Sequence, residues 1–161
     1  MAWFRRRHRD EDSTSQPVAE VTAPNVGPVN DAEQQWIDDQ LRRLRASGVD
    51  VADPAQLGAH YDRLLTRWYS LADGGRPDPN PDINLIGIGL GEHLRYRTGL
   101  DWVVVTDTDG AEIALYGQPG DILIYPTNAI AKRWVAHQAG FLPQFAEEIV
   151  RSVKEIRSGS N

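Results

Sequence analysis

Glu92 and His93, with Asp101 and Trp102 shortly after them, are the side chains of this sequence that come nearest to a chemical site. A carboxylate that is partly buried can have its pKa raised and can then act as a general acid or base. The sequence therefore offers one candidate constellation for acid–base chemistry, with Glu92 at its centre.

A structural role for Glu92 is the alternative, and the sequence favours it. Arg95 follows three residues later, a spacing at which side chains on a helix meet. A cation from elsewhere, such as Lys132 or Arg133, would serve equally well to fix the helix against its neighbour. We therefore assign no catalytic residue and leave Glu92 as a candidate.

Metal and cofactor sites are not predicted. The histidines His8, His60, His93 and His137 include no pair spaced four apart beside an acid, the pattern of a zinc-binding helix. Residues 107–110, Asp-Thr-Asp-Gly, lack the remaining ligands of a calcium loop and are expected to form a hairpin turn. Cysteine is absent, and neither a nucleophile elbow nor a phosphate-binding loop is present.

The candidate residues are positioned by the most apolar helix of the chain, expected from Asp82 to Thr98, where Gly99 ends it. Glycine inside a helix costs about 1 kcal/mol relative to alanine, so Gly87 and Gly91 indicate that the sheet or the C-terminal helix approaches the backbone closely. The alternating glycines of this stretch do not have the spacing of a dinucleotide-binding loop. One apolar stripe must face a core: Ile83, Ile86, Leu90 and Leu94.

Three strands follow this helix, at residues 102–106, 111–116 and 122–125. The turns between them, at 107–110 and 117–120, contain the Asp-Gly and Pro-Gly pairs that favour tight reversals. The segments therefore predict a three-stranded antiparallel meander. Both alternating sets of side chains are apolar, so both faces of the sheet should be covered at least in part.

Four further helices are expected, at residues 30–46, 53–73, 127–137 and 141–157. The first two begin with recognisable caps, Asn30 with Glu33 and Asp53 followed by proline. The Pro-rich segment 74–81 should be a non-helical connection. The fold class is thus α+β, a three-stranded meander packed by about five helices in a single domain.

We expect that domain at residues 29–157, preceded by a disordered arm at 1–28 and followed by a tail at 158–161. The arm combines charge blocks with Ser, Thr and Pro and has no apolar periodicity. A small basic-aromatic tag in the arm would permit weak contact with an anionic membrane surface, although the acidic residues 10–12 neutralise most of it. The tag consists of Trp3, Phe4, Arg5, Arg6, Arg7 and Arg9.

The charge of the chain argues against nucleic-acid binding. Four of the 17 basic residues lie in the first nine positions, which leaves 13 against 23 acidic residues and a net charge of −10 for residues 10–161. Such a surface repels a phosphate backbone. The lack of cysteine, of a signal peptide and of a membrane-spanning apolar run predicts a soluble, cytoplasmic protein.

Several short motifs are shared with a known family: Gly87-x-x-x-Gly91-Glu92, Thr98-Gly99-x-x-Trp102-Val103-Val104, Asp109-Gly110, Tyr125-Pro126 and Ala131-Lys132-Arg133. On these motifs residues 31–156 resemble the bacterial, largely actinobacterial, domain-of-unknown-function family DUF3806. The resemblance implies bacterial origin and a small α+β domain, and it brings no activity with it.

The sequence favours a non-enzymatic function, a protein-interaction or regulatory module, with an immunity-like protein as one form. Its partner would be a protein with a basic surface, because the domain is acidic and presents carboxylates. The alternative is a small hydrolase or ligand-binding enzyme that uses Glu92 with His93 and Asp101. The position of these three side chains around, or away from, an open cleft distinguishes the two hypotheses.

Overall fold

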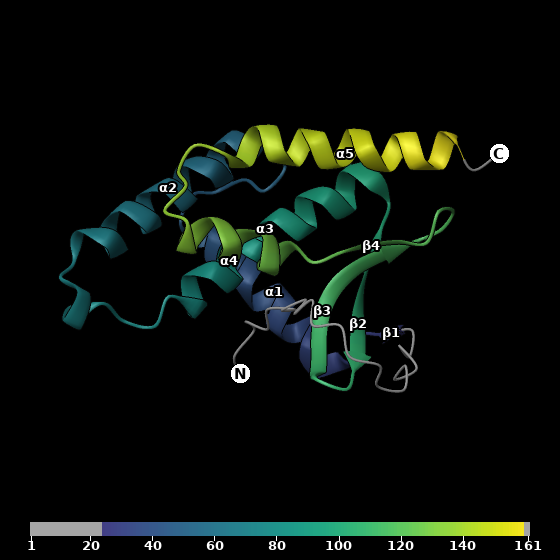
Figure 1. Ribbon diagram of the computed structural model, residues 1–161, viewed down its shortest axis with the longest axis horizontal. Coiled ribbons are helices and arrows are strands. Elements are labelled where there is room, and N and C mark those ends of the chain that lie inside the picture. The colour runs from purple at the N-terminus through teal and green to yellow at the C-terminus, as the bar shows by residue number, and fades with distance from the viewer. Residues whose placement is uncertain (1–23, 160–161) are drawn as a thin grey trace, which may run out of the picture.

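The computed structural model describes residues 24–159. Four strands, five α-helices and one short 3-10 helix follow one another along these residues (Figure 1). In chain order they are β1 (Asn25–Pro28), α1 (Asp31–Ala46), α2 (Pro54–Ser70), η1 (Asp73–Gly75), α3 (Asn80–Thr98), β2 (Asp101–Asp107), β3 (Gly110–Gly117), β4 (Ile122–Ile124), α4 (Pro126–Val135) and α5 (Leu142–Ser158).

Helix α3 is the centre of the fold, in contact with α1, α2, α4, α5 and β3 (Figure 1). Its residues are buried on several sides, which is why its sequence is apolar with small residues rather than sharply two-faced. The helix begins at Asn80 instead of the expected Asp82, because Pro81 is tolerated in a first turn that lacks hydrogen-bonded N–H groups. It ends at Gly99, whose φ of 72° is the left-handed conformation that glycine favours.

Two glycines of α3 mark the predicted close approaches. A Cβ on Gly91 would lie 2.1 Å from Cη2 of Trp102 in β2, so the expected contact with the sheet is confirmed there. A Cβ on Gly87 would lie 2.6 Å from Cα of Thr127, so at this position the neighbour is α4, not the sheet or the C-terminal helix. The central helix is therefore held between the sheet and α4 at distances that exclude larger side chains.

The sheet has four antiparallel strands in the order β1-β2-β3-β4, one more than the sequence predicted. The additional strand, β1, pairs Asn25 with Thr106 and Pro28 with Val103. The expectation of a disordered arm through residue 28 is thus wrong for residues 25–28. This strand pairs with β2 through its backbone, and its Asn-Val-Gly-Pro sequence carries no alternation that would have revealed it.

The two faces of the sheet contribute to different apolar clusters. One face joins the main core between the helices through Trp102, Ile113, Leu115, Ile122 and Ile124. The opposite face carries a second cluster, in which Val26, Tyr116, Leu123 and Tyr125 pack against the buried Val103, Val105 and Ala114. Both faces thus hold buried apolar side chains, as the strand pattern predicts.

The remaining helices agree closely with the sequence. The capping box of Asn30 and Glu33 is formed at α1, and Asp53 caps α2. Helix α2 ends at Ser70, before the expected glycines, and the connection that follows includes the short η1. No helix within residues 24–159 has the length and apolarity needed to cross a bilayer. The basic-aromatic tag Trp3 to Arg9 lies outside the described residues.

Candidate functional site

Five elements border an open groove of about 760 Å³: β1, α1, α3, the start of β2 and the end of β3. We call it the acidic groove and define it by the six lining residues that carry its chemistry: Gly27, Asp38, Glu92, Arg95, Asp101 and Trp102. The groove is the place where the candidate residues Glu92 and Asp101 come together.

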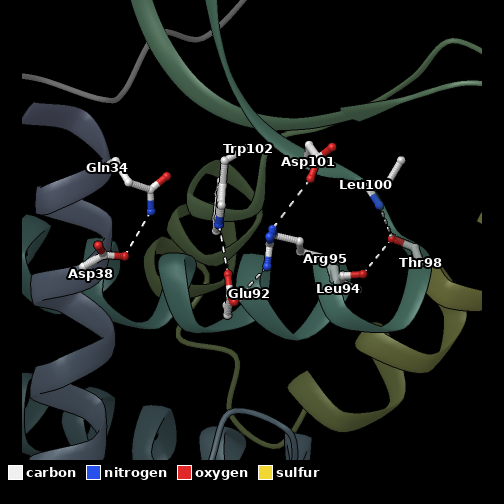
Figure 2. Close-up of polar contacts among 9 residues, drawn as sticks. All are labelled: Gln34, Asp38, Glu92, Leu94, Arg95, Thr98, Leu100, Asp101 and Trp102. Atoms are coloured by element: carbon white, nitrogen blue, oxygen red, sulfur yellow. Dashed lines mark hydrogen bonds and ion pairs between the residues drawn. The ribbon is translucent and has the colours of Figure 1, made fainter. Parts of the chain in front are cut away.

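Glu92 is held in this groove by hydrogen bonds from two side chains, Trp102 and Arg95 (Figure 2). The indole Nε1–H of Trp102 donates to Oε2 at 3.0 Å, and the guanidinium of Arg95 donates to Oε1 at 3.2 Å. The Glu92 side chain is 25 % exposed, so it is fixed by the fold and still reaches the groove. Of the three cations that the sequence offered as partners, the structure uses Arg95.

Arg95 also faces a second carboxylate (Figure 2). Its Nε lies 3.8 Å from Oδ1 of Asp101, a loose ion pair whose acidic partner is 80 % exposed. Across the groove, Asp38 on α1 accepts a hydrogen bond from Gln34 at 3.0 Å. Three carboxylates therefore border the groove with one guanidinium, and the local charge is −2.

The position of Trp102 follows from α3. Because Gly91 has no side chain, the indole lies directly on the helix backbone. This placement aims Nε1–H at Glu92 of the next position and buries the ring, which is 8 % exposed. The pair of residues Gly91-Glu92 thus sets both the depth of the tryptophan and the direction of its polar atom.

His93 is not part of the groove. The residue is 1 % exposed, and Nδ1 lies 3.0 Å from the carbonyl oxygen of Val51, to which it donates. Burial lowers the pKa of His93, and its Nε2 has no hydrogen-bond partner among residues 24–159. Adjacent residues on a helix do not face the same side, so Glu92 and His93 diverge. The constellation of Glu92, His93 and Asp101 expected from the sequence is therefore not assembled.

The other two candidate cations serve elsewhere or stay at the surface. The guanidinium of Arg133 lies over the ring of Phe145 at 4.4 Å and over Phe141 at 5.3 Å. Lys132 is exposed on α4. Neither contacts Glu92, so the link between α3 and the sheet passes through Trp102 and not through a cation of α4.

No cluster of three or more His, Asp and Glu side chains within residues 24–159 could hold a metal ion. The 107–110 segment is the β2–β3 turn, in which the Asp107 side chain accepts from the backbone N–H of Asp109 at 2.7 Å. The groove thus has carboxylates suited to a cationic group and no paired histidine suited to proton transfer.

Comparison with known proteins places the chain in a family. Residues 63–143 match the profile described as "Domain of unknown function (DUF3806)", which is half of the chain. This protein belongs to the DUF3806 family. No curated protein and no solved structure gives a significant match.

The DUF3806 match divides the acidic groove. Glu92, Arg95, Asp101 and Trp102 lie within the matched residues, whereas Gly27 and Asp38, on β1 and α1, lie before them. Sequence reasoning missed those two residues, because nothing local in β1 or α1 indicates that they meet α3. The family segment therefore supplies one wall of the groove, and the preceding elements supply the other.

Proposed function

We propose that this DUF3806 protein is a non-enzymatic interaction module whose acidic groove binds a basic segment of a protein partner. The observation that supports this most directly is the open groove itself, with Asp38, Glu92 and Asp101 around a single guanidinium. Lysine or arginine side chains are the groups that such a charge distribution attracts.

The arrangement of Glu92 favours binding over catalysis. Each of its two oxygens accepts a hydrogen bond from a structural donor, and the adjacent His93 is directed at Val51 instead. A general base needs a free path to the proton that it takes, and a partner residue usually tunes it. The hydrolase alternative therefore lacks His93, which it needs beside Glu92.

Charge over the whole chain supports the same class of partner. The formal net charge is −6, so long-range attraction would bring a basic protein surface toward the domain. A regulatory or immunity-like protein that covers a basic site of its target has this character. In the cytoplasm, which the absence of cysteine suggests, a basic protein surface is the partner to seek.

The test uses a short fluorescein-labelled peptide of alternating lysine and alanine, with binding followed by fluorescence anisotropy. Asp101→Lys should weaken binding by about tenfold, because it replaces an attractive charge at the groove with a repulsive one. Glu155→Lys is the matched control, since it makes the same charge change on an exposed residue of α5 outside the groove. If both variants lose the same affinity for the peptide, the loss is due to net charge alone, and the proposal is overturned.

A second variant tests shape without charge. A Cβ on Gly27 would meet no atom within 4 Å, so Gly27→Leu should fill the groove while leaving the fold stable. Gly74 has the same open surroundings and lies in η1, away from the groove, so Gly74→Leu is its control. Peptide binding should fall in Gly27→Leu alone. Unchanged binding in a stable Gly27→Leu protein would place the partner elsewhere.

A further inference from the structure

A second groove, of about 620 Å³, runs between α1 and the N-terminal end of α3. We call it the amide groove and define it by Trp36, Gln40, Arg43 and Asn84. The first three residues follow one another at four- and three-residue spacing and so form one stripe of α1. The acidic groove uses Gln34, Asp38 and Leu41 of the same helix, which lie on its opposite face.

Gln40 is the unusual residue of this groove. The residue is only 7 % exposed, and its carboxamide makes no hydrogen bond with any residue from 24 to 159. Its oxygen and nitrogen are not among the fully buried atoms that lack a partner, so the carboxamide still meets water on the side of the groove. The side chain borders the groove, so a ligand that displaces this water can hydrogen-bond to the carboxamide without competition from the described part of the chain.

The other polar groups of the groove also make no hydrogen bond or ion pair with one another or with the described part of the chain, except for the pair of Arg42 with Asp39. Neither the Asn84 carboxamide nor the Trp36 indole N–H has a hydrogen-bond partner in it, and Arg43 has no ion pair there. Arg42, by contrast, is paired with Asp39. Two guanidinium groups and one carboxylate thus border the groove, and its local charge is +1 on a chain whose net charge is −6.

We propose that the amide groove binds an extended peptide segment that carries an acidic side chain. The carboxamides of Gln40 and Asn84 each offer a donor and an acceptor, which match the C=O and N–H of a peptide group. Arg43 can hold a carboxylate through two parallel N–H donors, and the half-buried Trp36 ring offers an apolar surface beside it. An open trough between two helices suits a chain segment better than a small molecule, which is usually enclosed.

This site rests on residues that the acidic groove does not use, so it stands apart from the proposed function. Three of its four defining residues also lie before the DUF3806 match, and only Asn84 lies within it. The amide groove therefore forms where α1, which precedes the matched residues, packs on α3, which lies within them.

The experiment follows side-chain NMR signals of Gln40, Asn84 and Trp36 while peptides of alternating glutamate and alanine are added. The matching glutamine-alanine and lysine-alanine peptides and free glutarate are the comparison probes. Only the glutamate peptide should shift all three signals. In Arg43→Gln its affinity should fall by about tenfold, because the charged half of the carboxylate pair is lost. Arg43 is exposed, so this variant should fold normally.

Arg45→Gln is the matched control, since Arg45 is exposed on the same helix and does not line the groove. It should keep wild-type affinity. Four results would each overturn the proposal: equal affinity for the glutamine or lysine peptide, unchanged affinity in Arg43→Gln, the same loss in Arg45→Gln, or glutarate binding as tightly as the peptide. The last result would make the groove a small-anion site instead.

Discussion

The ring of Trp102 occupies the space into which a side chain at Gly91 would project, with Cη2 only 2.1 Å from the position of a Cβ. This contact packs the buried helix α3 directly against strand β2. It also aligns the indole N–H with Glu92, so the core packing and the acidic groove depend on the same glycine.

Gly91→Ala is expected to lower the free energy of unfolding by about 1–3 kcal/mol through overpacking, more than the roughly 1 kcal/mol that alanine gains in helix propensity. Urea denaturation measures it. In a Trp102→Leu background the same substitution should cost little, because the colliding ring is gone. A Gly91→Ala protein as stable as the wild type, in the Trp102 background, would show that the ring moves freely.

Glu92→Gln should destabilise the fold by about 1 kcal/mol, since the amide keeps the acceptor for Trp102 but loses the charge that holds Arg95. The value is modest because Arg95 is 44 % exposed and solvent screens the pair. Combining the change with Trp102→Phe measures the coupling between the two side chains. If Glu92→Gln were as stable as the wild type and yet failed to bind the lysine peptide, Glu92 would be a binding residue and not an anchor.

Local signals explain what the sequence predicted well. The cap of α1 needs only Asn30 and Glu33, three residues apart, and the pair of Glu92 with Arg95 needs only one helical turn. Gly91 pointed to a close neighbour, and the neighbour is the sheet, one of the two elements predicted. In each case the two interacting groups lie near each other in the chain, or one residue type is unfavourable without a close contact.

Non-local contacts explain what the sequence did not predict. Strand β1 depends on backbone pairing with β2, some 75 residues later, and its side chains carry no pattern. Asp38 becomes part of a site only because α1 packs beside α3. His93 is different, because the divergence of adjacent helical residues was a signal that could have separated it from Glu92 in advance.

A protein that begins at residue 29 should be less stable than one that begins at residue 24, on the order of 1–2 kcal/mol, because it lacks the four β1 residues paired with β2. Thermal unfolding of the pair measures this. The full-length chain is the third member of the series, and we expect residues 1–23 to add little to the midpoint. Equal midpoints for the proteins that begin at residues 24 and 29 would mean that β1 contributes nothing to stability.

His93 should make stability depend on pH below neutrality. Nδ1–H donates to Val51, so a second proton would go to the buried Nε2, which has no acceptor in the part of the chain that the structure describes. Burial lowers the pKa of this ring in the folded state, so below the ordinary value of 6.5 the unfolded chain binds more protons than the folded one. The contribution of the neutral His93 ring to the free energy of unfolding is therefore fully present above about pH 6.5. It is lost as the pH falls through the folded-state pKa.

Urea unfolding between about pH 5 and 7.5 measures this slope, and His93→Gln should flatten it. His60→Gln is the comparison, because burial lowers the pKa of His60 as well, and that variant should keep the part of the slope due to His93. Asp82 and Glu112 act with the opposite sign: burial raises the pKa of each carboxyl, so their contribution is lost as the pH rises from their ordinary values of 3.8 and 4.5. If the His93→Gln protein keeps the full wild-type slope of unfolding free energy against pH, the acid sensitivity comes from another group and protonation of His93 does not affect stability.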